Sequence, residues 1–234
     1  MKKLLLTALF NSLLFGGSAL VLLCPQAIVA RTQPTADYDA VRDFSITSNP
    51  NGVWSYGWQS SLGSPLNFYT VTDSATFNGL SAWLETGMTM YAPPFVGHND
   101  TDGTLCYLSF CVPPGYLHLH PGANDELSVV RWTAPTSGTF LLQGAARGLD
   151  FYTSTNFLAI LNSERHLFSA TLSGKRNPPV FFHRTLTVSA GDTIDFVVNF
   201  GQNGSYFNDS TGIVINNVRH FLSKLRVGRN FYYL

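Results

Sequence analysis

The sequence predicts an all-β protein whose strands form an antiparallel β-sandwich. From Asp43 onward, short runs of β-type residues alternate with Gly, Pro, Asn and Asp, and the runs recur about every ten residues. The turn signals between the runs are typical of antiparallel strands. No stretch keeps the hydrophobic period of an amphipathic helix. Of the 234 residues, 45% are hydrophobic and only 12% are charged, which is sufficient for one well-buried core.

The N-terminal residues predict an export signal. Two lysines precede an apolar run that extends to about Leu23, and Ala30 supplies a small residue at the expected cleavage point. Polar residues and glycines interrupt the run, so a removed signal peptide over residues 1–30 is favoured over a retained membrane helix. We therefore expect a secreted, extracellular protein without stable membrane insertion, with a polar lead-in over residues 31–42.

The remaining chain divides into a sandwich over residues 43–218 and a basic, aromatic C-terminal tail over residues 219–234. In the segment 193–200, apolar and polar residues alternate, which predicts a half-buried strand with a polar outer face that includes Asp195. The expected strands are 43–47, 53–59, 67–72, 81–86, 104–112, 116–119, 127–133, 139–146, 156–162, 166–172, 180–188, 193–200 and 212–218.

Charge and motifs exclude several classes of function. The 14 basic and 14 acidic residues balance, so the chain offers no electrostatic footprint for nucleic acid. The mature chain has no Gly-x-Ser-x-Gly elbow, no His-Glu-x-x-His, no phosphate-cradling loop and no zinc-type Cys/His spacing. We therefore expect a protein that is not an enzyme, although a pair of catalytic carboxylates in a cleft has no sequence motif.

Three sequence blocks carry a family resemblance: DFSITSNPNGVWSYGW (43–58), LHPGANDELSVVRWTAPTSGTFLLQGAARGLD (119–150) and VSAGDTIDFVVNFGQNGSYFNDSTGIVI (188–215). Together they resemble a bacterial exported β-sandwich module, similar in outline to carbohydrate-binding jelly rolls, that occurs in proteins with a C-terminal PEP-CTERM sorting tail. The resemblance covers most of residues 43–218. It implies a jelly-roll fold and an envelope or extracellular-matrix setting, but no characterised activity.

The C-terminal end departs from that family pattern. After Asn217 the chain reads VRHFLSKLRVGRNFYYL, without a Val-Pro-Glu-Pro motif and without an apolar membrane segment. Free secretion is therefore favoured over surface retention. The tail over residues 219–234 is either a frayed terminus or a basic interaction segment.

The stretch NPNGVWSYGW places three large aromatic residues, Trp54, Tyr56 and Trp58, at every second position after a turn. In an extended chain this period puts all three side chains on one face. That face is either part of the hydrophobic core or an exposed platform on which sugar rings stack. The sequence leaves both interpretations open.

Removal of the signal peptide, which contains Cys24, leaves an even pair of cysteines, Cys106 and Cys111. Export exposes them to oxidising conditions, so we expect a disulfide between them, with two reduced thiols as the alternative. An extended chain would hold the two residues too far apart, and a bridge therefore requires a turn between them. Acylation of Cys24 is disfavoured because Leu23, rather than a small residue, precedes it.

The loop HNDTDGT resembles part of a calcium loop through the spacing of Asp100 and Asp102. His98 replaces the first carboxylate of such a loop, and Ser109 stands where a bidentate Glu is required. An EF-hand is therefore excluded.

A structural calcium site of another kind stays open. Jelly rolls pair their first and last strands, which would bring Asp43 or Asn51 near Asn208 and Asp209. The candidate calcium ligands are Asp43, Asn51 and Asp209, and ordinary Asx turns are the alternative.

His118 and His120 lie two residues apart in an expected strand, so their side chains share a face. They are either part of a metal site or two polar residues on a solvent-facing strand. The second interpretation is favoured because no later segment supplies further histidine ligands.

We expect a non-catalytic module that binds extracellular carbohydrate, with polysaccharide as its partner. A structural or adhesive component of the extracellular matrix is the alternative, and a polysaccharide-acting enzyme is the third candidate. The expected ligand contacts are Trp58, Asp100, Asp102, Asn203, Tyr206 and Asn208.

Overall fold

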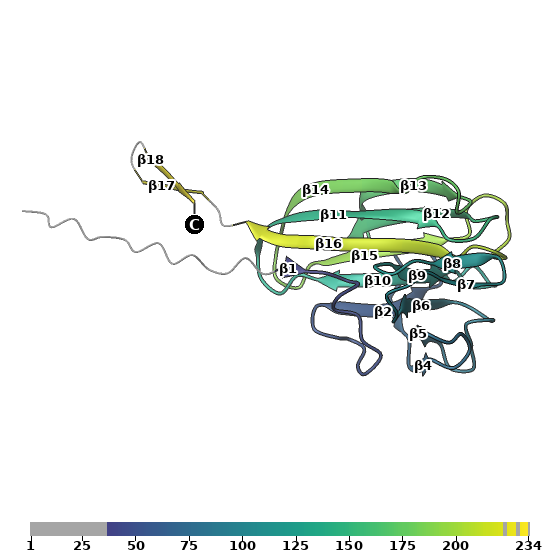
Figure 1. Ribbon diagram of the computed structural model, residues 1–234. Coiled ribbons are helices and arrows are strands. Elements are labelled where there is room, and N and C mark those ends of the chain that lie inside the picture. Colours follow the sequence, from purple (N-terminus) through teal and green to yellow (C-terminus); the bar gives the residue numbers. More distant parts are fainter. Residues whose placement is uncertain (1–36, 222–223, 228–229, 234) are drawn as a thin grey trace, which may run out of the picture. The chain divides into compact units, whose positions relative to one another are not determined.

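The computed structural model describes residues 37–221, 224–227 and 230–233 (Figure 1). The expected signal peptide over residues 1–30 lies outside the described residues. Within the described ranges the chain forms strands, turns and bends, and no helix there is long and apolar enough to cross a membrane.

Two antiparallel sheets make up the fold. The first has eight strands. Its order is β14 (Val180–Val188), β11 (Gly138–Gly148), β16 (Thr211–Phe221), β9 (Leu117–His120), β6 (Phe95–Asn99), β5 (Leu80–Leu84) and β4 (Val71–Asp73), with β1 (Asp37–Tyr38) also paired to β16.

The second sheet has six strands, and two hairpins complete the described strands. The order of the second sheet is β13 (Arg165–Ser173), β12 (Ser154–Leu161), β15 (Thr193–Asn199), β10 (Leu127–Thr133), β2 (Trp54–Gln59) and β3 (Asn67–Phe68). The hairpins are β7 (Leu105–Tyr107) with β8 (Phe110–Val112), and β17 (Lys224–Val227) with β18 (Asn230–Tyr233).

The chain crosses repeatedly from one sheet to the other, as Figure 1 shows for β9, β10, β11 and β12. Most pairings in the two sheets therefore join strands that are not consecutive in the chain, and the sandwich is closed by long-range contacts. The prediction of an all-β, antiparallel jelly-roll β-sandwich is confirmed.

The main core lies between the two sheets and contains most of the large aromatic side chains. Trp54 on β2 is 1% exposed and Tyr56 is fully buried, and Trp132 on β10 pairs in register with Trp54. The aromatic face of β2 therefore belongs to the core. Burial of each such side chain contributes about 1.5–3 kcal/mol, so this row is a principal stabiliser of the sandwich.

A second hydrophobic cluster covers the other face of the eight-stranded sheet. On β5 and β6, alternate residues divide between the clusters: Trp83 and Val96 join the main core, whereas Ala82 and Phe95 join the second cluster. Phe110 of the β7–β8 hairpin also belongs to the second cluster. The hairpin therefore covers this end of the sheet, which is buried on both faces.

The sandwich begins earlier and ends later than the expected boundaries at residues 43 and 218. Asp37 and Tyr38 pair with β16, and the amide of Ala40 donates to the carbonyl of Ile215 at 2.9 Å. β16 itself continues to Phe221. The last part of the expected lead-in is thus a strand of the sandwich.

The strand expected over residues 43–47 is not formed. Asp39 Oδ1 accepts hydrogen bonds from the amides of Val41 and Arg42, and the amide of Asp43 donates to the carbonyl of Asp39. These contacts fold the chain into a turn. The apolar residues that suggested a strand instead pack against the main core from this turn and the following bends.

β6 was not predicted, because its sequence FVGHN is short, follows two prolines and contains a glycine. Gly97 suits the close packing here, since a Cβ at this position would lie 3.0 Å from the carbonyl oxygen of Ser81. A residue that weakens the strand signal in the sequence is therefore the one that allows β5 and β6 to pair closely.

The polar outer face expected for β15 is also wrong. Asp195 is 1% exposed and Val197 is fully buried, because a third cluster of apolar residues covers the outer face of the six-stranded sheet. Leu66 packs over this cluster from the loop before β3. Asp195 is retained inside by hydrogen bonds from Arg131 and Gln59.

Candidate functional site

A cleft of about 170 Å³ lies where the tip of the β7–β8 hairpin meets the loop 200–210 and the end of β9. Its walls come from segments far apart in the sequence, so the fold must hold each one in place. The amide of Cys111 donates to the carbonyl of Leu149 at 3.0 Å, and Lys175 Nζ donates to the carbonyl of Ser109 at 2.8 Å. The first contact attaches the hairpin to the end of β11, and the second attaches it to the turn after β13.

A disulfide between Cys106 and Cys111 closes the hairpin, as the sequence predicted. The two residues are opposite each other in the register of β7 and β8. The turn at Leu108 and Ser109 provides the reversal that the bridge requires. The expected single strand over residues 104–112 is therefore two short strands.

The rim of the cleft is apolar and aromatic. The rings of Tyr206 and Phe207 stack with their centroids 4.4 Å apart and their planes 29° apart. Phe207 is 65% exposed, Tyr91 is 66% exposed and Leu108 is 85% exposed. Exposure of several large apolar side chains around one opening is characteristic of binding sites.

The floor of the cleft is polar and is organised by Asp150. The Asp150 side chain is buried; Oδ2 accepts a hydrogen bond from Ser109 Oγ, and Oδ1 accepts one from the amide of Tyr152 at 3.1 Å. Asn208 Oδ1 lies 3.4 Å from Ser109 Oγ and comes from a residue with a left-handed backbone (φ 66°). Segments on both sides of the cleft thus meet at its floor.

His118 lies on the face of β9 that points away from the main core. It is 1% exposed and its ring packs against Phe95 and Phe110. Nε2 lies 3.0 Å from Ser210 Oγ, whereas Nδ1 has no hydrogen-bond partner. Burial, reinforced by the neighbouring His120, lowers the pKa of His118 to about 3, so its imidazole is neutral at pH 7.

His120 is partly buried and lines the same cleft. Its Nδ1 donates to the carbonyl of Pro121 at 2.8 Å, which fixes the tautomer and leaves Nε2 as an acceptor. Burial lowers the pKa of His120 to about 4, against the opposing effects of the Pro121 hydrogen bond and the Asp150 charge. The expectation of a solvent-facing histidine pair is wrong, because the β7–β8 hairpin and the loop 200–210 cover this face.

Two of the expected ligand contacts, Tyr206 and Asn208, line the cleft. Three others do not. Asp100 is exposed after β6 and accepts hydrogen bonds from Ser81 Oγ and His98 Nδ1. Asp102 and Asn203 are exposed, and Asn203 Oδ1 accepts from a backbone amide two residues later, as in an Asx turn.

Trp58, the sixth expected contact, does not provide an exposed ring. It is half-buried and packs against the main core. Its indole N–H donates to Glu85 Oε2 at 2.7 Å, so its polar atom is already paired. Trp58 therefore joins β2 to the end of β5 rather than forming a platform for sugar.

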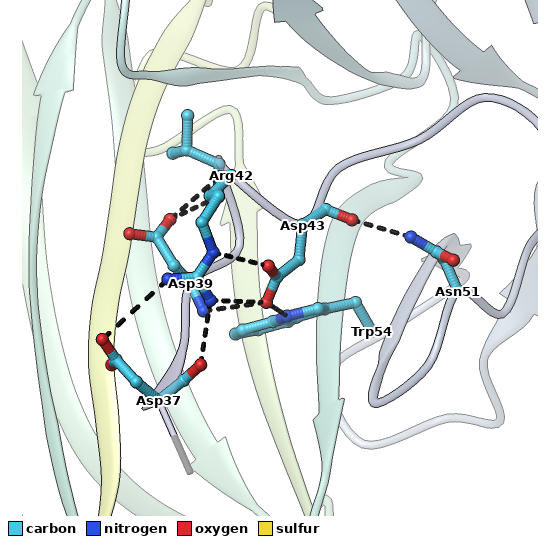
Figure 2. Close-up of polar contacts among 7 residues, drawn as sticks. Asp37, Asp39, Arg42, Asp43, Asn51 and Trp54 are labelled. Atoms are coloured by element: carbon cyan, nitrogen blue, oxygen red, sulfur yellow. Dashed lines mark hydrogen bonds and ion pairs between the residues drawn. The ribbon is translucent and has the colours of Figure 1, made fainter.

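The three candidate calcium ligands do not come together. Figure 2 shows Asp43 with the guanidinium of Arg42 directed at its carboxylate, with Nε at 2.9 Å and Nη2 at 3.2 Å. Trp54 Nε1 also donates to Asp43, and Asn51 Nδ2 donates to its carbonyl (Figure 2). Arg42 is the counter-ion of Asp43, and a bound calcium would be repelled by it.

Asp209 belongs to a different cluster, at the start of β16. Its side chain is fully buried; Oδ1 accepts from the amide of Ser154 at 2.8 Å, and Oδ2 has no hydrogen-bond partner. Desolvation raises the pKa of Asp209 to about 7, and the nearby Asp150 carboxylate adds to this effect. Among the described residues, no group of three or more His, Cys, Asp and Glu side chains is arranged to hold a metal ion.

The polar floor and most of the rim were not predicted from the sequence. Asp150 precedes two aromatic residues, Phe151 and Tyr152, directly after a strand, and this pattern is typical of a binding loop. Leu108 gave no comparable signal, because its position in a turn becomes clear only when β7 and β8 pair.

Comparisons with known proteins give only distant likenesses. No protein-family model matches the chain, and no curated protein matches it. Three similar solved structures are carbohydrate-binding modules: CBM51 from Clostridium perfringens GH95 in complex with methyl-galactose, the C-terminal CBM6 of LamC from Zobellia galactanivorans, and a family 35 module from an environmental isolate.

Their sequence identities to this chain are 13%, 13% and 11%, and their TM-scores are 0.34, 0.27 and 0.30. The alignments cover 64%, 63% and 56% of this chain and 99%, 92% and 91% of those structures, in the same order. At these values the likeness carries no information about a ligand, so the function must be inferred from the cleft itself.

Proposed function

We propose that the protein is an exported, non-catalytic module that binds extracellular carbohydrate in the cleft beside the β7–β8 hairpin. The observation that carries this proposal is the stacked pair of half-buried Tyr206 and exposed Phe207 beside a buried polar floor at Asp150. One side of the cleft is thus aromatic and the other offers hydrogen bonds.

A sugar ring matches this arrangement chemically. Its C–H groups form apolar faces that pack on the rings of Tyr206 or Tyr91, and its hydroxyl groups donate to acceptors in the floor. The carboxylate of Asp150 and the free Nε2 of neutral His120 are acceptors, and the side-chain amide of Asn208 can both donate and accept. Because the cleft is lined by no Lys or Arg among the described residues, an uncharged sugar is the best match.

Calorimetric titration of the purified protein with bacterial and plant polysaccharides and their constituent sugars tests the proposal. Tyr206→Ala should weaken binding about tenfold, which corresponds to about 1.4 kcal/mol. Phe181→Ala is the matched control, because Phe181 is 74% exposed on β14 and does not line the cleft. If Phe181→Ala abolished binding and Tyr206→Ala did not, the site would lie on the sheet and the proposal would be wrong.

A structural or adhesive role in the extracellular matrix is the alternative. In that case the exposed apolar residues around the cleft would contact another copy of the protein or another matrix component. The absence of binding to every glycan, together with self-association that Leu108→Gly and Phe207→Ala abolish, would favour this role.

An enzyme acting on polysaccharide is the third candidate, and one observation favours it. His120 and Asp150 both line the cleft, where an ionisable pair could transfer protons to and from a bound sugar. Release of reducing ends or unsaturated products from a bound polysaccharide, abolished by His120→Gln, would establish catalysis. Binding without product release would support the non-catalytic proposal.

We also propose export to the extracellular space, supported by the basic start and apolar run of residues 1–30 and by the resemblance to modules of PEP-CTERM-sorted proteins. The disulfide of the β7–β8 hairpin is compatible with an oxidising compartment. N-terminal sequencing of protein recovered from the culture medium should give a chain that begins near Arg31. Recovery only from the cytoplasm, with Met1 retained, would contradict this part of the proposal.

A further inference from the structure

Leu108 lies at a position where neither the backbone conformation nor burial favours a large apolar side chain. It is the first of the two residues in the turn between β7 and β8, and its backbone has a φ of 52°. Two-residue hairpin turns with positive φ favour Gly, Asn or Asp, because a branched side chain is strained there. At 85% exposure, Leu108 also gains nothing from burial.

The exposed side chain of Leu108 lines the proposed sugar cleft, and so do Phe207 and Tyr91. These three residues come from three separate segments of the chain: the hairpin turn, the loop 200–210 and the connection between β5 and β6. Convergence of exposed apolar groups from separate segments on one opening indicates an apolar contact that the isolated protein does not satisfy.

A sugar without an apolar substituent would not cover these exposed apolar side chains. Aromatic rings such as those of Tyr206 and Phe207 can stack on a sugar face, but the branched aliphatic group of Leu108 has no flat face to offer. The cleft volume of about 170 Å³ is also below the range of about 300–1,000 Å³ that is typical of larger ligands. Room for one ring remains, and any further part of the ligand must extend over the rim.

We propose that the ligand is an uncharged amphipathic glycoside, in which the sugar ring enters the cleft and an alkyl or acyl substituent lies along Leu108 and Phe207. This inference rests on the proposed function and specifies its ligand class. The polar floor at Asp150 and His120 selects the ring, and the apolar rim selects the substituent. Asp150 is the single carboxylate among the described residues that line the cleft, and no Lys or Arg lines it, so no group on the rim requires a charged ligand.

The test compares methyl, hexyl and octyl glycosides of glucose, galactose and mannose, each titrated calorimetrically below its critical micelle concentration. For the sugar that binds, affinity should rise at least tenfold from the methyl to the octyl glycoside, because each buried CH₂ strengthens association. A sugar-free amphiphile with an octyl chain on a short ethylene glycol headgroup should bind at least tenfold more weakly than the octyl glycoside.

Leu108→Gly separates binding from folding. Glycine suits the positive φ at this position, so the melting temperature should be unchanged or higher. Measured against its own affinity for the methyl glycoside, the variant should lose most of the gain in affinity that the octyl chain gives. Leu62→Gly is the control, since Leu62 is 43% exposed and does not line the cleft, and it should keep the full gain.

The outcomes distinguish this inference from the proposed function. Equal affinities for the methyl and octyl glycosides, or a gain that Leu108→Gly leaves intact, would overturn the amphipathic ligand and leave sugar binding in place. Glycan binding in the polysaccharide panel with none of the alkyl glycosides bound would do the same. Failure of both the panel and the glycosides, or equal binding of the sugar-free amphiphile, would overturn sugar binding itself.

Discussion

Ser109 donates a hydrogen bond to Asp150, a residue 41 positions later in the chain, and this contact joins the tip of the disulfide hairpin to the floor of the cleft. A β-bridge between Phe110 and Asp150 lies next to it, and the amide of Cys111 donates to the carbonyl of Leu149. The hairpin therefore acts as a wall of the cleft that is fixed from two sides, by its own disulfide and by the end of β11.

The first prediction concerns this contact. Ser109→Ala removes a donor from the buried carboxylate of Asp150, which should destabilise the fold by about 1–3 kcal/mol and weaken ligand binding by about five- to tenfold. Urea denaturation measures the first effect and calorimetric titration the second. Ser60→Ala, on an exposed loop residue, should change neither beyond about 0.5 kcal/mol. Unchanged stability and affinity in Ser109→Ala would show that the hairpin tip is held without this bond.

The second prediction concerns the buried ion pair of Arg131 and Asp195, which face each other across β10 and β15. Arg131 Nε lies 2.6 Å from Oδ1 and Nη2 lies 2.8 Å from Oδ2, while the Asp195 side chain is only 2% exposed. Arg131→Met leaves the buried carboxylate without its counter-ion, although the hydrogen bond from Gln59 remains, and should cost about 3–5 kcal/mol of unfolding free energy.

The double variant Arg131→Met with Asp195→Leu should recover part of that loss, because both charges are then removed from the sheet while the buried amide of Gln59 loses its acceptor. Glu164→Gln, at an exposed position, is the control and should change the free energy of unfolding by less than about 0.5 kcal/mol. A double variant no more stable than Arg131→Met would mean that the pair stabilises the fold beyond mutual neutralisation.

A single sequence predicts some features of this fold better than others. Strands with many β-branched and aromatic residues were located well: the expected ranges 127–133 and 180–188 coincide with β10 and β14. In both strands the hydrophobic pattern is long enough to identify the strand despite the turn residues on either side. β6 was missed because Gly97 interrupts its pattern, and the close packing that favours this glycine comes from β5, a separate strand.

The cleft was harder to predict than the fold, because its parts are distant in sequence. Tyr206 and Asn208 were selected as polar and aromatic residues of a Gly/Asn-rich loop, and both line the cleft. Asp150, Ser109 and His120 join them only through the docking of the β7–β8 hairpin. Two-residue alternation predicted that the histidines share a face but contained no information on what covers that face.

The third prediction follows from the positions of the tryptophans. Trp54 and Trp132 are buried in the main core, Trp83 is 7% exposed, and Trp58 is half-buried beneath its bond to Glu85. We expect a blue-shifted tryptophan emission maximum that changes little when ligand binds, because no tryptophan lines the cleft within the described residues. A saturable shift of the emission with ligand would place a tryptophan at the binding surface and contradict the assigned site.

Trp58→Phe gives an independent check of the same assignment. The variant loses the hydrogen bond to Glu85 and part of its packing, so the melting temperature should fall by several degrees. The affinity for ligand should stay within twofold of the native value. A large loss of affinity at unchanged stability would show that Trp58 contacts the ligand.

The last prediction concerns the pH dependence of stability, in which Asp209 and His118 act in opposite directions. The pKa of Asp209 is raised to about 7 by burial, above its unfolded value of about 3.8, so its contribution to stability is complete below about pH 4 and is lost as pH rises through 7. The pKa of His118 is lowered to about 3 from 6.5, so its contribution is present above pH 6.5 and is lost as pH falls toward 3.

Asp209→Asn isolates the first effect. At pH 8 the native protein buries an ionised carboxylate whose Oδ2 has no partner, and the neutral amide should raise the melting temperature by about 2–6 °C. At pH 4, where the native carboxyl is protonated, the two proteins should melt within about 1 °C of each other. Asp102→Asn, at an exposed loop position, should show no such pH-dependent difference.

The Asp209→Asn variant should also show how the buried histidines contribute to the pH dependence of stability. The variant lacks the carboxyl group whose contribution to stability rises as the pH falls, so the melting temperature of Asp209→Asn should decrease more steeply than that of the native protein between pH 7 and pH 4. Thermal denaturation of both proteins across this interval measures the difference in slope. Parallel curves would mean that Asp209 titrates at its ordinary pKa in the folded protein, and that water reaches its second oxygen.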